Sequence, residues 1–157
     1  MATVIVVPAR RKPASPDALL LDDQLCFALH AASRAMTSTY RPLLDELGLT
    51  YTQYLVMLVL WETDVVTMGE LGRRLHLDSG TLSPLVRRMV DAGFVERARS
   101  IDDERVVEVR LTSVGRSLRR RAAALPPMVC NAVGLADAAR QALVADLRAL
   151  ADRLHTT

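Results

Sequence analysis

Apolar residues recur along this chain with two different periods. Four early stretches show them three or four residues apart, which predicts helices that each bury one face. From Phe94 to Leu111 the period shortens to two, which predicts a β-hairpin with its turn over Ser100–Glu104. Helical spacing returns after Ser113, and Pro126–Pro127 is expected to interrupt it. The four early stretches are residues 25–40, 50–62, 67–75 and 79–92.

Capping residues suggest where the early helices begin and end. Asp22 is the expected N-cap of the first helix, and Thr67 is the expected N-cap of the third. Gly93 stands where a glycine commonly ends a helix, and we expect it to end the fourth. Pro42 and Gly48 predict that the first helix stops before them.

The two ends of the chain differ from its middle. Residues 1–16 hold three prolines and three basic residues, which is typical of a flexible arm. The last helix carries a leucine stripe at Leu143, Leu147, Leu150 and Leu154, which predicts packing against another chain. The predicted segments are an arm (1–16), an N-terminal helical segment (17–49), a central domain (50–112) and a C-terminal helical segment (113–157).

Charge is distributed unevenly although the net charge is only +2. Residues 73–121 hold twelve Arg against seven Asp and Glu, and such a basic field attracts phosphate backbones. Because Lys12 is the only lysine, a merely solvated Arg-rich surface is the alternative. We see no secretory signal and no apolar run of membrane length, so we expect a soluble cytoplasmic protein whose two cysteines are reduced at rest. No Cys/His grouping has zinc-site spacing, and we expect no metal or other cofactor.

The predicted order of helix, short turn, helix and hairpin is that of a winged helix-turn-helix. The connection His76–Asp78 is short enough for one helix to brace the next, which could then enter the major groove of DNA. Arginines of the hairpin could reach an adjacent minor groove. A helical pair packed on a small sheet, without DNA binding, is the alternative. The candidate DNA-binding residues are Ser79, Gly80, Thr81, Ser83, Arg87 and Arg88 in the second helix and Arg97, Arg99 and Arg105 in the hairpin.

The stretch from Leu71 to Gly115 resembles the MarR family of transcription regulators. The matching motifs are Ala-Gly-Phe-Val at 92–95, Asp-Glu-Arg at 103–105 and Leu-Thr-Ser-Val-Gly at 111–115. The resemblance spans roughly residues 19–154. It implies a mainly α (α+β) fold in which the N- and C-terminal helices form a dimerisation region and the homodimer binds a palindromic double-stranded operator. It also implies that Arg105 enters the minor groove and that Asp103 holds it.

Three further motifs resemble one branch of that family, the organic-hydroperoxide-responsive (OhrR) repressors. They are LDDQLCFAL, which contains Cys26, LTYTQYLVMLVLW from Leu49 to Trp61, and LDSGTL from Leu77 to Leu82. This branch implies that Cys26 is the peroxide-sensing thiol and that Tyr40 and Tyr51 donate hydrogen bonds to its thiolate. The two-cysteine subgroup implies an intersubunit disulfide with Cys130. His30 stands where the branch often has Tyr, and it either tunes the Cys26 pKa or is a plain surface residue.

The residues themselves support a sensor that is shared between two chains. In the first turn of a helix, the dipole favours the Cys26 thiolate, although Asp22 and Asp23 oppose it. Tyr40 follows fourteen residues later, which on one straight helix is about 21 Å and too far for a hydrogen bond. The tyrosine must therefore come from a second chain, unless the helix folds back.

We therefore predict a DNA-binding repressor, not an enzyme, that releases its operator when an organic hydroperoxide oxidises Cys26 to a sulfenic acid. One alternative keeps the DNA binding but has a small phenolic ligand in the dimer cleft cause release. A thiol peroxidase using Cys26 and Cys130 is a third hypothesis, which sustained peroxide turnover would reveal. A pure protein-interaction module is a fourth, and sequence-specific DNA binding would exclude it.

Overall fold

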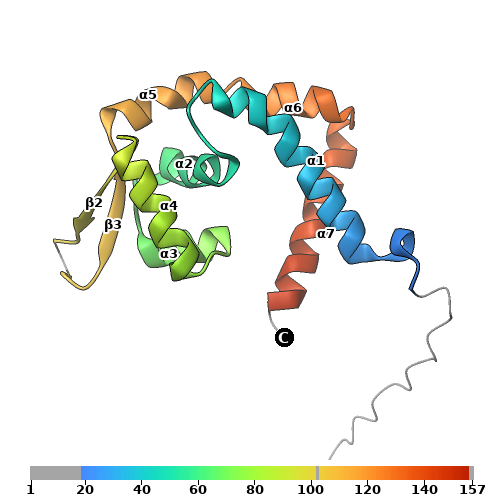
Figure 1. The fold of residues 1–157 in the computed structure, drawn as a ribbon, viewed down its shortest axis with the longest axis horizontal. Coiled ribbons are helices and arrows are strands. Elements are labelled where there is room, and N and C mark those ends of the chain that lie inside the picture. The colour runs from blue at the N-terminus through green and yellow to red at the C-terminus, as the bar shows by residue number, and fades with distance from the viewer. Residues whose placement is uncertain (1–18, 102, 156–157) are drawn as a thin grey trace, which may run out of the picture. The chain divides into compact units, whose positions relative to one another are not determined.

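The computed structural model describes residues 19–101 and 103–155, so the predicted arm at 1–16 lies outside the described residues. The chain divides into two compact units, residues 1–36 and 37–157, and we describe each by itself. The second unit holds most of the helices and a three-stranded antiparallel sheet (Figure 1). The elements are η2 (Leu21–Asp23), α1 (Leu25–Asp45), α2 (Tyr51–Thr63), β1 (Val65–Thr67), α3 (Met68–Leu75), α4 (Ser79–Asp91), β2 (Val95–Arg99), β3 (Val107–Leu111), α5 (Ser113–Ala122), α6 (Leu125–Val133) and α7 (Asp137–His155).

In the first unit, the start of α1 differs from the sequence prediction. Asp22 is not a helix N-cap, because Leu21–Asp23 form one 3-10 turn and Gln24 follows in an extended conformation. The Gln24 side-chain amide donates to the Leu20 carbonyl at 2.9 Å, and this bond stabilises the turn. The helix begins only after Gln24, so Cys26 is its second residue and lies closer to the N-terminus than the sequence indicated.

The predicted break at Pro42 is also wrong, because α1 continues through this proline to Asp45. A proline inside a helix removes one backbone hydrogen bond and costs about 3 kcal/mol in isolation. Here the residues after it repay that cost by packing, since Leu44 is 1% exposed and Leu47 is buried in the same core. The chain reverses at Gly48, whose φ of +70° favours glycine.

Thr67 and Gly93 mark helix ends as predicted, and Thr50, which the sequence placed inside its helix, is an N-cap. Thr50 caps α2 in a reciprocal arrangement, in which its hydroxyl accepts from the Gln53 amide and the Gln53 side chain accepts from the Thr50 amide. Thr67 caps α3 by accepting from the Glu70 amide at 3.1 Å. Gly93 directly follows Ala92, the C-cap of α4, and its φ of +76° confirms it as the glycine that ends this helix.

The sheet confirms the predicted hairpin and adds one strand that the sequence did not indicate. β2 and β3 pair in antiparallel register from Val95 opposite Leu111 to Arg99 opposite Val107. The added strand β1 pairs with the other edge of β3, so the order is β1-β3-β2. Val109, in the central strand, is completely buried. The three residues of β1 are too few to show a period of two, which is why the pattern missed them.

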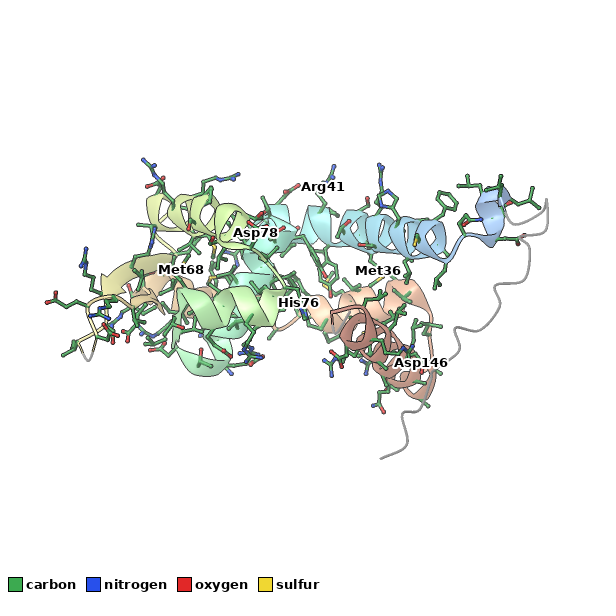
Figure 2. The ribbon with its side chains drawn as sticks, turned by 90° about the horizontal axis from the view of Figure 1, so that it is seen from below. Met36, Arg41, Met68, His76, Asp78 and Asp146 are labelled. Carbon is green, nitrogen blue, oxygen red and sulfur yellow. The ribbon has the colours of Figure 1, made fainter. Side chains whose placement is uncertain are left out.

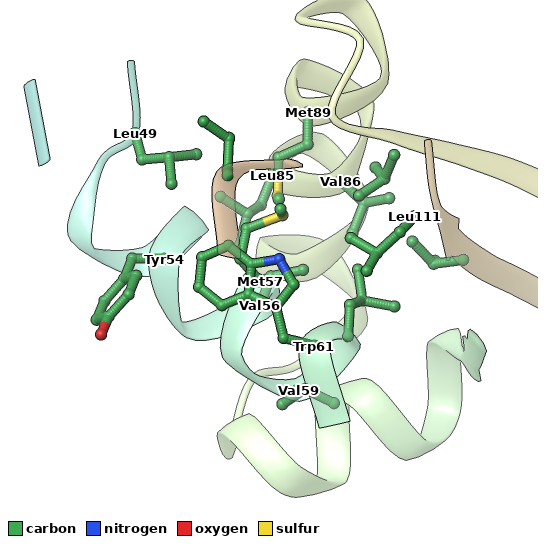
Figure 3. Packing of buried hydrophobic residues seen from close by; sticks show 14 of the residues in the cluster. Leu49, Tyr54, Val56, Met57, Val59, Trp61, Leu85, Val86, Met89 and Leu111 are labelled. Carbon is green, nitrogen blue, oxygen red and sulfur yellow. The ribbon is translucent and has the colours of Figure 1, made fainter. Parts of the chain in front are cut away.

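The core of the second unit lies where α2 meets α3, α4, α5 and the sheet. Leucine, valine and methionine fill most of it, as the scarcity of aromatic residues requires. Trp61 packs among aliphatic side chains, and the Tyr54 hydroxyl points away from the cluster (Figure 3). The residues with essentially no exposure include Val56, Met57, Leu60, Leu71, Val86, Met89 and Val109.

The C-terminal helices leave apolar surface uncovered. The interruption predicted at the proline pair occurs at residues 123–124, and the prolines open α6. On α7, Leu143 and Leu147 are 47% and 40% exposed. In the described part of the chain no single helix is long and apolar enough to cross a membrane, and only a pair bent by 99°, residues 113–133 with 137–154, meets the length and composition criteria. The predicted segment boundaries at 49 and 112 stay predictions.

Candidate functional site

The exposed face of α4 carries most of the residues that the sequence singled out. Ser79, Gly80, Thr81, Arg87 and Arg88 are exposed, and Ser83 is partly exposed, while the opposite face enters the core. Pro84 lies on the same exposed face, within α4. The sequence analysis missed it, although its spacing of four from Gly80 and three from Arg87 was a usable signal. Its ring offers an apolar contact of the kind that thymine methyl groups accept.

The start of α4 is fixed by Asp78, which the sequence analysis placed only in the connection. Its carboxylate accepts from the Thr81 amide at 2.8 Å and from the Thr81 hydroxyl at 3.0 Å. These bonds, the backbone one first, lower the pKa of Asp78. Figure 2 labels Asp78 together with His76, the exposed residue that turns the chain in a left-handed conformation with a φ of 53°. The Thr81 hydroxyl is therefore a capping group as well as a candidate for base contact.

The hairpin of β2 and β3 is the wing of this fold. Asp103 organises its turn, residues 100–106. Its carboxylate accepts from the backbone amide of Arg105 at 2.9 Å, and its carbonyl accepts from the Val106 amide. The Arg99 guanidinium donates to the Glu104 carbonyl across the same turn. The bond from Asp103 reaches the Arg105 backbone, so it shapes the loop and leaves the Arg105 side chain exposed.

The Ala-Gly-Phe-Val and Leu-Thr-Ser-Val-Gly motifs meet at one contact. The Thr112 hydroxyl lies 2.7 Å from the Gly93 carbonyl and accepts from the Gly115 amide as the N-cap of α5. A Cβ at Gly115 would lie 2.1 Å from the Phe94 carbonyl oxygen. The two motifs therefore join the end of α4, the predicted recognition helix, to the start of α5. Only glycine fits at position 115.

A hollow of about 330 Å³ lies between the helices α3 and α4 and the strands β2 and β3. Ser79 and Ser83 of α4 line it together with Arg73 of α3 and Arg97 of β2. Arg73 forms an ion pair with Glu70 at 2.6 Å. These polar groups share the hollow with the apolar side chains of Met68, Leu77, Leu82 and Val107.

The candidate sensor residues of the second unit also come together. The Tyr40 ring lies 5.3 Å from the Tyr51 ring and 5.7 Å from the Tyr54 ring, measured between centroids. Burial first, then the charges of Tyr51 and of Cys130, raise the pKa of Tyr40. Burial first, together with the other two phenols, raises the pKa of Tyr54 to about 12. The cluster therefore contains all three tyrosines of the chain, of which the sequence analysis predicted only Tyr40 and Tyr51 as site residues.

The other two candidate sensor residues lie in the first unit. Cys26 is a free cysteine, exposed in the first turn of α1, and His30 is exposed one turn later. Cys130, also free, is partly buried within α6. Among the described residues, no group of three His, Cys, Asp or Glu side chains is placed to hold a metal ion.

The winged helix, its uncovered C-terminal helices and its motifs define a class of DNA-binding transcription regulators. A family model described as the transcriptional regulator SarA/Rot matches residues 38–121, and the chain belongs to this MarR-like, winged-helix family. Over 140 residues it is 43% identical to the organic hydroperoxide resistance transcriptional regulator of Bacillus subtilis, a match that covers 89% of this chain and 90% of that one. It is 47% identical over 135 residues to the regulator TtmR of Methylorubrum extorquens, covering 86% and 69% of the two chains.

Solved structures agree with this assignment. Reduced AbfR bound to DNA is 32% identical, with a TM-score of 0.69 over 85% of this chain and 94% of that one. Overoxidised AbfR bound to DNA is 33% identical, with a TM-score of 0.68 over the same shares. The disulfide form of AbfR is 34% identical, with a TM-score of 0.58 over 83% of this chain and 91% of that one. The mostly helical winged-helix fold and a role as a DNA-binding transcriptional regulator are thus established for this chain.

Proposed function

We propose that this regulator is a homodimeric repressor that senses organic hydroperoxides through Cys26 and then leaves a palindromic operator. The observation that carries the proposal is the packing of the Tyr40 ring against the Tyr51 ring, together with the free, exposed thiol of Cys26. The similarity to the Bacillus subtilis regulator of organic hydroperoxide resistance supports it. The existence of reduced, overoxidised and disulfide forms of AbfR supports a thiol switch in the wider family.

The proposed chemistry has two steps. The Cys26 thiolate attacks the peroxide oxygen, the O–O bond breaks, and the products are a sulfenic acid and an alcohol. The Cys130 thiol then displaces water from that sulfenic acid and forms a disulfide. Cys26 is a free, exposed cysteine at the second position of α1, so a peroxide can reach its sulfur. Tyr40 and Tyr51 of the partner chain would donate hydrogen bonds to the Cys26 sulfur, and His30, one turn along α1, would be a further donor.

For the DNA interface, we propose that α4 enters the major groove and the wing the adjacent minor groove. Ser79, Gly80, Thr81 and Ser83 would meet base edges. Two further groups of residues would bind phosphates or line the minor groove. The first group is Arg87 and Arg88 of α4, and the second is Arg97, Arg99 and Arg105 of the wing, with Asp103 shaping its turn.

The decisive experiment is a DNA-shift titration with and without an organic hydroperoxide such as cumene hydroperoxide. We expect Cys26→Ser to bind the operator like the wild type and to stay bound after peroxide. Cys130→Ser is the matched control, because it keeps the sensing thiol and loses only the disulfide, seen on a non-reducing gel as a missing covalent dimer band. Normal release of the Cys26→Ser variant by peroxide would refute the proposal.

A second candidate function rests on a hollow of about 260 Å³ at the end of α1 and the start of α2. Arg41, Thr50 and Tyr51 line it, and these groups could bind a small phenolic acid. Release of DNA by salicylate from the Cys26→Ser variant, at unchanged protein oxidation state, would favour this ligand-controlled repressor.

A further inference from the structure

The start of α5 is tied to the rest of the winged helix by side chains from two other elements. The Arg116 guanidinium donates to both carboxylate oxygens of Asp64, at 2.8 Å from Nε and 2.6 Å from Nη2. The Trp61 indole donates to the Gly115 carbonyl at 3.0 Å. Near the other end of α5, Arg121 donates to the Glu46 carbonyl at 2.7 Å. The direction of α5 is therefore set by contacts with α2 and with the chain just after α1.

Asp64 stands at a junction of three elements. Its amide donates to the Leu60 carbonyl and ends α2, and its carbonyl accepts from the Leu111 amide at the end of β3. Its φ of 63° is a conformation that favours glycine over residues with a side chain. The carboxylate of Asp64 at this position forms the bidentate pair with Arg116.

The neighbouring charges reinforce that pair. The hydrogen bond from Arg116 is the first cause that lowers the pKa of Asp64, and Arg110 of β3 adds to it. In turn, Asp64 first and Glu96 of β2 further raise the pKa of Arg116. Both partners are 52% exposed, so the pair adds little to the free energy of unfolding. A planar guanidinium held by two parallel bonds fixes orientation more than stability.

We propose that Asp64 and Arg116 are positioning residues for DNA binding, because they set the angle at which α5 leaves the winged helix. The inference rests on the proposed dimer, since α5 leads through α6 to α7, whose uncovered leucines form the proposed dimer surface. A ten-residue helix is about 15 Å long, so a rotation of about 10° at its start displaces its end by about 3 Å. One base-pair step of DNA is about 3.4 Å. Such a rotation therefore changes the separation of two recognition helices by about one base pair.

The test measures the preference of the reduced dimer for half-site spacing. An operator is first selected from random duplexes with the wild-type protein, and versions with one base pair added or removed between the half-sites are made. We expect the wild type to lose about tenfold or more in affinity on either altered duplex. In Asp64→Asn and Arg116→Gln, affinity for the selected operator should fall about tenfold and the spacing preference should shrink to about threefold or less. Arg116→Lys keeps the charge but not the two parallel bonds, so its operator affinity and its spacing preference should lie between those of the wild type and Arg116→Gln.

Controls separate this role from the two alternatives. Arg120→Gln removes the same charge from an exposed position of the same helix and should behave like the wild type. If Arg116→Gln lowers the slope of log affinity against log salt by about one, Arg116 binds a phosphate and the proposal is wrong. An equal loss of affinity at every spacing, or no loss at all, would also overturn it. If thermal melting finds Arg116→Gln unfolded, Asp64→Asn carries the same test with the arginine intact. All measurements use reduced protein without peroxide, so failure of the peroxide response leaves this result untouched.

Discussion

The Ala-Gly-Phe-Val and Leu-Thr-Ser-Val-Gly motifs, which identify this family, meet at Gly115, a residue without a side chain. Gly115 lets α5 approach the backbone after α4, where a Cβ would lie 2.1 Å from the Phe94 carbonyl oxygen and 3.1 Å from Leu111. Since the obstacle is backbone, it cannot move aside like a flexible side chain. We expect Gly115→Ala to lower the free energy of unfolding by about 1–3 kcal/mol, as overpacking of a core commonly does.

Urea denaturation followed by circular dichroism measures that loss. Gly69→Ala is the matched control, because a Cβ at this helical glycine meets nothing within 4 Å. In a helix that exchange is favourable by up to about 1 kcal/mol. Equal stability of Gly115→Ala and the wild type would mean that α5 can shift without cost, and the proposed junction would lose its rigidity.

The buried phenol of Tyr54 predicts how stability depends on alkaline pH. In the folded protein its pKa is raised to about 12, chiefly by burial, against about 10 in an unfolded chain. The stabilising contribution is therefore fully present below pH 10 and is lost as the pH rises towards 12, because the unfolded chain releases its proton first. We expect the urea midpoint to fall between about pH 10 and 12, and to fall less steeply in Tyr54→Phe. Identical slopes for the two proteins would contradict this assignment.

At the scale of the element, the recognition helix depends on its cap. Asp78 accepts from both the amide and the hydroxyl of Thr81, so Asp78→Ala leaves two donors at the helix start without that partner. We expect a loss of about 1 kcal/mol in unfolding free energy and a larger relative loss in operator affinity, since Ser79 and Gly80 would fray. Asp78→Asn keeps a side-chain acceptor, so it should retain most of the unfolding free energy and most of the operator affinity. Unfolding and DNA-shift titrations on the three proteins measure this, and an unaltered affinity for Asp78→Ala would rule out the expected link.

The elements that the sequence predicted well are those whose boundaries are local. Thr67 and Gly93 act through bonds or dihedral angles within a few residues, and each lies where the pattern put it. The elements missed depend on partners far along the chain. The helix passes Pro42 because of tertiary packing, and β1 exists because β3 pairs with it.

The same division holds for the candidate site. Motifs picked out the exposed residues of α4 and the wing before any fold was known, because residue type and spacing carry that information. The contact of Tyr54 with Tyr40 and the pairing of Asp64 with Arg116 could not be foreseen. Their partners lie 14 and 52 residues apart, and no periodicity links such positions.

At the scale of the whole molecule, the proposed dimer must cover the leucines of α7. Leu143 and Leu147 are 47% and 40% exposed, one turn apart on the same side of the helix. Exposed apolar stripes of this kind mark interfaces between chains. A glutamate at the centre of such a surface would be desolvated without a partner, which is unfavourable.

We therefore expect Leu147→Glu to weaken self-association about tenfold to a hundredfold, since truncation or disruption of a central interface residue commonly costs that much. Sedimentation velocity over a range of protein concentrations measures the change. Gln141→Glu introduces the same charge on the opposite side of α7 and should associate like the wild type. A monomer reaches only one half-site, so operator affinity should fall in parallel for Leu147→Glu alone. If the Leu147→Glu and Gln141→Glu dimers dissociate at the same protein concentration, the leucine stripe of α7 is not the dimer interface. In that case α5 would have to set the spacing of the two recognition helices through other helices.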